Sequence, residues 1–198
     1  MNSNALHVVF GTGQVGGALV QRLMEFGVEV RAVSRHRPVG LSQDVDWRPT
    51  DAADPQSATE AAKGATVIYQ CLNASYTAWP TLFPPLQHGV LMAAEHTGSL
   101  LVSFENVYGY GPTGGRPMTE DLPLSATTVK GRTRAAMTHD LLSASAAGRV
   151  RIAIGRAGPH RDRSGCRPVR GRCHRVGTRS AVLPQRGGGQ EGRLHRGP

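Results

Sequence analysis

The chain has 198 residues, 39% of them hydrophobic, which is enough for one domain with a buried core. Its formal net charge of +9 suggests a nucleic-acid or membrane partner, but the charge is unevenly placed. Residues 1–157 carry 13 Lys and Arg against 12 Asp and Glu, whereas residues 158–198 carry 10 Arg against 2 acids. No apolar run is long enough for a membrane span and the first residues do not resemble a signal peptide, so we expect a cytoplasmic protein without a membrane partner.

Short apolar segments alternate with amphipathic segments of helix length, a pattern typical of βαβ units and a parallel sheet. The expected strands are residues 5–10, 28–33, 45–47, 66–71, 99–104 and 150–155. The expected helices are residues 14–26, 54–64, 86–96 and 130–148. Asp54 is the expected N-cap of the second helix, and Pro55 fits its first turn. The sequence predicts an α/β fold over residues 1–157, with a Rossmann-like, doubly wound parallel sheet that is incomplete at its C-terminus.

A glycine-rich loop follows the first expected strand and leads into the first expected helix. Its sequence, G-T-G-Q-V-G, matches the G-x-G-x-x-G pattern in the required context. Gly11 would allow the tight turn, Gly13 would let a pyrophosphate approach the backbone, and Gly16 would let the helix pack closely on the strand. Free N–H groups and the helix dipole would hold the anion. The predicted cofactor loop is Gly11, Thr12, Gly13, Gln14, Val15 and Gly16, with a glycine turn that binds nothing as the alternative.

The end of the second expected strand lacks the carboxylate that usually holds the ribose 2′-hydroxyl of NAD. That place has the sequence V-S-R-H-R, residues 33–37. Ser34 and Arg35 suit a 2′-phosphate, so NADP is expected, with NAD still open and a solvated basic loop as the alternative. Asp51 follows the third expected strand and could contact the adenine, or it could simply be solvated.

Further motifs extend this pattern along the chain. They are D-A-A-D at 51–54, T-V-I-Y-Q-C-L-N-A at 66–74, L-L-V-S-F-E-N-V-Y-G-Y-G-P at 100–112 and T-E-D-L-P at 119–123 before a Lys-bearing helix. With the glycine loop, these motifs resemble the extended short-chain dehydrogenase/reductase family of nucleoside-sugar epimerases, dehydratases and atypical relatives. The resemblance implies NAD(P) binding, with Asn73 near the cofactor, and a carbonyl or nucleoside-sugar-like substrate.

The catalytic pattern of that family is missing from this chain. The family uses a Tyr four residues before a Lys, but Ala126 stands four residues before Lys130. The family also has a Ser or Thr four residues before the Tyr of V-Y-G, where this chain has Phe104. We therefore assign no catalytic residue. The polar neighbours of Phe104 could substitute, although a hydrogen-bonded turn is the favoured interpretation; they are Ser103, Glu105 and Asn106.

Residues 158–198 contain 10 Arg and 9 Gly but no aromatic residue, so we expect them to be disordered. Their composition favours translation out of frame, in place of the further strand and substrate lobe that the resemblance implies. An Arg/Gly-rich nucleic-acid-binding arm is the alternative, disfavoured because no aromatic residues are interleaved. Cys166 and Cys173 lack zinc-finger spacing, so no metal is expected, and the three cysteines are expected to be reduced.

Three functions remain open from the sequence. The chain could be an NADP-dependent oxidoreductase or epimerase-like enzyme, a catalytically silent NADP(H)-binding regulatory module, or a non-functional frameshifted fragment. If the sixth strand is a bare sheet edge, exposed apolar surface also makes a homo-oligomer plausible.

Overall fold

The computed structural model describes residues 5–158. They form a six-stranded, wholly parallel sheet in the order β3-β2-β1-β4-β5-β6. The strands are β1 (Leu6–Phe10), β2 (Val30–Ser34), β3 (Asp46–Pro49), β4 (Ala65–Gln70), β5 (Leu100–Asn106) and β6 (Arg151–Ala157). The helices are α1 (Gln14–Glu25), α2 (Pro55–Ala61), α3 (Trp79–Thr97) and α4 (Val129–Ala146), with short 3₁₀ helices η1 (Tyr76–Ala78) and η2 (Tyr108–Tyr110). The Rossmann-like α/β fold predicted from the sequence is confirmed.

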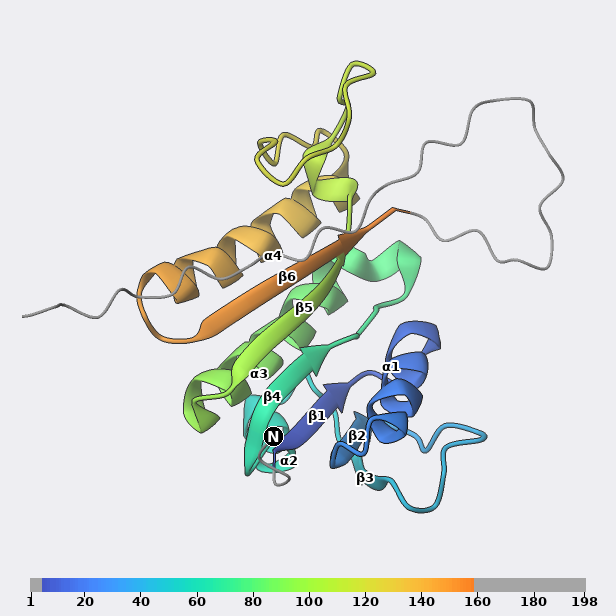
Figure 1. Cartoon of the computed structure of the whole chain (residues 1–198). Coiled ribbons are helices and arrows are strands. Elements are labelled where there is room, and N and C mark those ends of the chain that lie inside the picture. The colour runs from blue at the N-terminus through green and yellow to red at the C-terminus, as the bar shows by residue number, and fades with distance from the viewer. Residues whose placement is uncertain (1–4, 159–198) are drawn as a thin grey trace, which may run out of the picture. The chain divides into compact units, whose positions relative to one another are not determined.

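The helices cover the two faces of the sheet unequally. Alternate side chains of a strand point to opposite faces. Val8 and Phe10 belong to a core formed with α2, α3 and α4, whereas Val9 packs with Val20 and Leu23 of α1. Figure 1 shows the same arrangement, with α1 on one face and the other three helices on the opposite face. Because each fully buried Val or Leu side chain contributes roughly 1.5–3 kcal/mol, these two cores hold the sheet between its helices.

The start of α3 differs from the sequence prediction. The apolar spacing predicts a helix at residues 86–96, but α3 begins at Trp79 and contains Pro84 and Pro85, residues that usually end a helix. Trp79 and Phe83 are buried together and their rings meet edge to face, 5.4 Å between centroids. The Trp79 indole also donates a hydrogen bond to the Ala74 carbonyl. Packing of these aromatic residues therefore outweighs the local cost of the prolines.

The predicted N-cap of the second helix is confirmed. The Asp54 carboxylate accepts hydrogen bonds from the backbone N–H groups of Gln56 and Ser57, and Pro55 lies in the first turn. These contacts satisfy donors that a helix N-terminus would otherwise leave without partners.

Strand β6 forms one edge of the sheet and is paired only with β5 among residues 5–158. Leu101, Ser103 and Glu105 of β5 are buried on the face covered by α3 and α4. The alternate residues Val102 and Phe104 lie on the other face, and Phe104 is 37% exposed. None of the helices in the described range is both long and apolar enough to cross a membrane.

Candidate functional site

The predicted cofactor residues gather at one edge of the sheet. The glycine loop follows β1, Ser34 ends β2 and Arg35 comes next, and Asp51 and Asn73 follow β3 and β4. The carboxyl ends of parallel strands meet at the same edge, so these positions lie side by side. The strand order reverses between β1 and β4, where open α/β sheets bind their ligands. The structure thus brings the predicted residues to the edge of the sheet where this class of fold binds its ligands.

Two glycines of the loop are required by the packing of the chain itself. Gly11 has φ +90°, and a Cβ there would lie 2.8 Å from the carbonyl carbon of Cys71, just past the end of β4. A Cβ on Gly16 would lie 1.8 Å from the Gly11 carbonyl oxygen. The Cys71 N–H donates to the Phe10 carbonyl, which fixes this close approach of the two strands. Both glycines therefore serve the turn and the close seating of α1.

Gly13 has no such packing role. Its φ of −71° is one that any residue adopts, and a Cβ at this position would meet no atom within 4 Å. Gly13 is the N-cap of α1, where no side chain caps the helix and no acidic residue lies in the first turn. Gly13, Gln14 and Val15 are exposed. The first N–H groups of α1 and the positive end of its dipole thus face open space, an arrangement that suits an anion.

At the end of β2, the Ser34 hydroxyl already has hydrogen-bond partners, whereas the Arg35 guanidinium has none in the described range. The Ser34 hydroxyl donates to the His36 carbonyl at 2.8 Å and accepts from the Trp47 indole at 3.1 Å. Arg35 is exposed and forms no side-chain hydrogen bond or ion pair with any residue in the range 5–158. Arg37 donates to the Ser42 carbonyl at 2.9 Å. Arg35 is therefore better placed than Ser34 to donate to an added phosphate.

Asp51 and Asn73 are both exposed at the ends of their strands. One carboxylate oxygen of Asp51 accepts a hydrogen bond from the Ala53 N–H at 3.0 Å, so the side chain closes a turn. Its other oxygen remains able to accept. Cys71 lies between β4 and Asn73, and burial raises the pKa of its thiol to about 12, so this free cysteine stays protonated at neutral pH.

Two clefts flank this edge of the sheet. A cleft of about 500 Å³ lies between α1 and residues 38–42, and Thr12 is the one predicted residue that lines it. Another, of about 640 Å³, lies between β3 and α2 and is lined by none of them. Of the predicted cofactor residues, only Thr12 lines either of these two clefts.

The polar residues around Phe104 have structural roles. The Ser103 hydroxyl is buried and accepts a hydrogen bond from the Gln70 amide at 3.3 Å. Asn106 accepts from the Tyr108 N–H, which closes the turn after β5. Glu105 faces α4, away from Phe104. Asn106 thus takes part in the hydrogen-bonded turn expected of these three residues, whereas Ser103 and Glu105 make buried contacts to neighbouring elements. The exposed Phe104 ring can neither donate nor accept.

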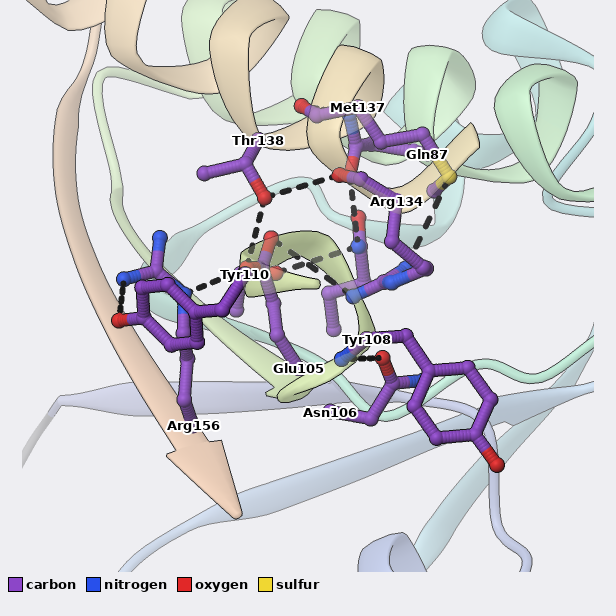
Figure 2. Close-up of polar contacts among 11 residues, drawn as sticks. Gln87, Glu105, Asn106, Tyr108, Tyr110, Arg134, Met137, Thr138 and Arg156 are labelled. Carbon is purple, nitrogen blue, oxygen red and sulfur yellow. Dashed lines mark hydrogen bonds and ion pairs between the residues drawn. The ribbon is translucent and has the colours of Figure 1, made fainter. Parts of the chain in front are cut away.

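Glu105 is the centre of a buried ionic network that the sequence analysis did not find (Figure 2). One of its oxygens accepts from the Thr138 hydroxyl at 2.8 Å and from Arg156 at 3.1 Å, and the other lies 3.7 Å from Arg134. Arg156 also donates to the Tyr110 hydroxyl at 2.8 Å. Burial lowers the pKa of Arg134, and the charge of Glu105 opposes this shift. The network ties β5, β6, η2 and α4 together.

A second cluster that local sequence patterns did not predict lies just outside this network. The Lys130 ammonium sits 3.4 Å from the centre of the Tyr76 ring. The Tyr76 and Tyr108 rings each contact Trp79, with centroids 5.5 and 5.7 Å from it. Their residues come from η1, α3, η2 and α4, so no short motif could have revealed the cluster.

No metal site is formed by the described residues, since no three His, Cys, Asp or Glu side chains gather within the range 5–158. Cys166, Cys173 and the rest of the Arg/Gly-rich segment lie outside that range. The predictions made for residues 159–198 therefore stay predictions.

The chain matches a known protein family. The model of the NAD dependent epimerase/dehydratase family matches residues 8–161. Among solved structures, a UDP-galactose 4-epimerase superposes with a TM-score of 0.65 at 23% identity, over 75% of this chain and 54% of that chain. A UDP-glucose 4-epimerase of Thermus thermophilus in complex with NAD gives 0.67 at 21% identity, over 81% and 58%. A short-chain dehydrogenase/reductase superfamily protein from Agrobacterium tumefaciens with bound NAD gives 0.61 at 22% identity, over 75% and 48%.

The comparison with curated proteins gave no match. The likenesses to solved structures concern the fold, and this chain spans about half the length of those proteins. The family match includes both the glycine loop and the V-Y-G segment, which carried the resemblance in the sequence. The chain therefore belongs to the NAD dependent epimerase/dehydratase family.

Proposed function

We propose that this chain binds a nicotinamide adenine dinucleotide, with the pyrophosphate against Gly13 and the N-terminus of α1. The observation that carries the proposal is the empty space where a Gly13 side chain would be, beside uncapped helix N–H groups. The chain gains nothing from a glycine there for its own packing. A pyrophosphate that approaches the backbone closely supplies the reason. Two of the similar structures hold NAD, which supports the same class of ligand.

Within this class, the charge at the end of β2 favours NADP over NAD. Arg35 is exposed and has no acidic partner in the described range, and no carboxylate stands where NAD-selective sites usually place one. A guanidinium forms strong, charge-assisted hydrogen bonds to a phosphate. Asp51 and Asn73 would border the adenosine and nicotinamide sides of the same ligand.

The activity that fits the family is hydride transfer to or from a carbonyl or nucleoside-sugar-like substrate. When bound, the dinucleotide supplies or accepts the hydride. A silent cofactor-binding module is the second candidate, favoured by Phe104, which leaves the usual Ser or Thr position without a polar atom. Binding is common to both functions, so it is the property to test first.

Calorimetric titration of the full chain with NADPH, NADP⁺, NADH and NAD⁺ tests the proposal. We expect binding heat, strongest for the 2′-phosphorylated forms. Gly13→Val should weaken NADPH binding by about tenfold or more, because its side chain would enter the ligand space. It should lower the free energy of unfolding by no more than about 1 kcal/mol, the cost of a poorer N-cap, since a Cβ there meets no protein atom within 4 Å.

Gly17→Ala is the matched control for that variant. Its Cβ would lie 3.5 Å from the Thr12 carbonyl oxygen, an ordinary van der Waals contact, so binding should be kept. Absence of heat with all four dinucleotides would contradict the proposed function. Equal loss of affinity in both glycine variants would contradict the role given to Gly13.

A further inference from the structure

One face of β5 and β6 is covered by no helix of the described chain. Helix α1 packs on β1 and β2, whereas α3 and α4 pack on the opposite face of β4, β5 and β6. Figure 1 shows α3 and α4 behind β5 and β6, and no coloured helix in front of these two strands. Wholly parallel sheets are almost always covered on both faces. Residues 5–158 therefore leave one face of this sheet open, and we call it the open face.

The two faces of β5 differ in burial. Leu101, Ser103 and Glu105 point toward α3 and α4 and are all buried, whereas the residues that alternate with them are not. The open-face residues of β5 and β6 are Leu100, Val102, Phe104, Asn106, Arg151, Ala153, Gly155 and Ala157. Arg151, at the start of β6, is the one charged residue among them. The open face is therefore uncharged along most of its length.

The open face has a ridge on β5 and a furrow on β6. Three neighbouring pairs each join a larger side chain on β5 to a small residue on β6: Val102 with Ala153, Phe104 with Gly155, and Asn106 with Ala157. A Cβ on Gly155 would meet no atom within 4 Å, so the furrow is open space there. The exposed Phe104 ring stands beside this space. The face thus carries a projection and a hollow side by side.

We propose that two copies of this chain associate through the open face, with the Phe104 ring of each copy packed over Gly155 of the other. A two-fold axis that runs parallel to the strands, between β5 and β6, places β5 of one copy over β6 of the other. Each ridge then lies in a furrow, and every contact occurs twice, as an isologous interface requires. Packed sheets lie about 10 Å apart, a space that a large side chain opposite a small one fills.

The charge of the open face agrees with this arrangement. Arg151 lies beside Leu100 in the pairing of β5 and β6, so the same axis places each Arg151 opposite Leu100 of the other copy. The two arginines therefore do not oppose each other across the interface. Residues 159–198 contain ten Arg, and their large apolar residues are three Val and two Leu. That composition offers little apolar surface to the open face, whereas a second copy offers a matching one.

The size of the open face limits the strength of the dimer. Strands lie about 4.8 Å apart and rise about 3.3 Å per residue, so three strands of about seven residues span roughly 300 Å². Specific interfaces usually bury about 800 Å² on each partner, and smaller ones are weak. We therefore expect a reversible dimer with a Kd of about 10 µM or weaker.

Sedimentation velocity of the full chain, from about 1 µM to about 1 mM, tests the proposal. The weight-average mass should rise from that of one chain to that of two and then level off. Phe104→Ala should raise the Kd by about tenfold or more, because it removes the projection. Leu142→Ala is the matched control, since Leu142 is an exposed apolar residue of α4, on the covered side of the sheet. Its loss should leave the Kd unchanged.

Gly155→Phe distinguishes a specific fit from general apolar association. The new ring would meet Phe104 of the other copy and raise the Kd by about tenfold or more, although its added apolar surface would strengthen unspecific association. The double variant with Phe104→Ala and Gly155→Phe exchanges projection and hollow, so it should dimerise again. Circular dichroism and urea unfolding check that the variants fold. Folding is expected, because a Cβ on Gly155 has free space.

The outcomes against the inference are distinct. A chain that stays monomeric up to about 1 mM, or that grows beyond the dimer without a plateau, would overturn it. An unchanged Kd in Phe104→Ala or in Gly155→Phe would place the contact on another surface. A double variant that is weaker than either single variant would contradict the exchange of ridge and furrow. These measurements need no dinucleotide, so they are independent of the proposed function.

Discussion

The loop between β1 and α1 and the segment between β5 and α4 lie at the same edge of one sheet, but they follow the sequence pattern of the family to different degrees. The first keeps every glycine of its motif, each with a distinct physical reason. The second keeps V-Y-G but has Phe104 and Ala126 where the resemblance implies polar side chains. A backbone-based anion site needs only a few local residues, whereas an acid/base site needs side chains that several elements bring together.

The largest expected effect concerns the glycine loop itself. Gly16→Ala should lower the free energy of unfolding by about 4 kcal/mol or more, because the new Cβ would overlap the Gly11 carbonyl oxygen at 1.8 Å. Urea unfolding of the full chain measures it. Gly17→Ala in the same helix should be neutral or stabilising by up to about 1 kcal/mol. Similar urea midpoints for the two variants would show that the loop tolerates a side chain at Gly16, which would contradict the packing role given to that glycine.

The next effect concerns the segment after β5. Glu105→Gln should lower the free energy of unfolding by about 3–5 kcal/mol, because it leaves the buried Arg134 and the half-buried Arg156 without their carboxylate. Glu95→Gln makes the same chemical change in a pair with Arg149, which is 54% exposed, and should cost no more than about 1 kcal/mol. The urea unfolding midpoints of the two variants measure these two losses of stability. Equal small losses would mean that the buried network does not hold this end of the sheet together.

A smaller effect is expected on cofactor affinity, at Arg35 after the end of β2. Arg35→Ala should weaken NADPH binding by about 10–100-fold and leave NADH binding nearly unchanged, since a charged hydrogen bond contributes about 1.5–3 kcal/mol. Arg37→Ala should matter less, because that guanidinium already donates to the Ser42 carbonyl. Calorimetry with both dinucleotides measures the preference. Equal loss for NADPH and NADH would contradict the choice of NADP.

The smallest expected effect lies at the opposite end of β1. Burial lowers the pKa of His7 below its ordinary value of 6.5, and its ring contacts the Tyr69 hydroxyl at 3.1 Å. As the pH falls below 6.5, the unfolded chain takes up this proton before the folded chain does, so stability is full above 6.5 and declines below it. Unfolding midpoints between about pH 5 and pH 8 should show this slope. His7→Gln should remove it, and an unchanged slope would contradict the assignment to His7.

The sequence by itself determined the alternation of strands and helices along the chain, the glycine loop, the Asp54 cap and the family. These features depend on residues close together in the sequence, where periodicity and backbone geometry act directly. It also identified Phe104 and Ala126 as departures from the family pattern. It placed the start of α3 too late, because the burial of Trp79 and Phe83 against distant residues outweighed Pro84 and Pro85.

Only the tertiary structure decided what surrounds those departures. Glu105 meets Arg134 and Arg156 because β5, α4 and β6 pack together, and Lys130 meets Tyr76 across more than fifty residues of sequence. Side chains that come together by packing leave no fixed spacing in the sequence. An anion site made of backbone N–H groups does leave such a spacing, because consecutive residues build it.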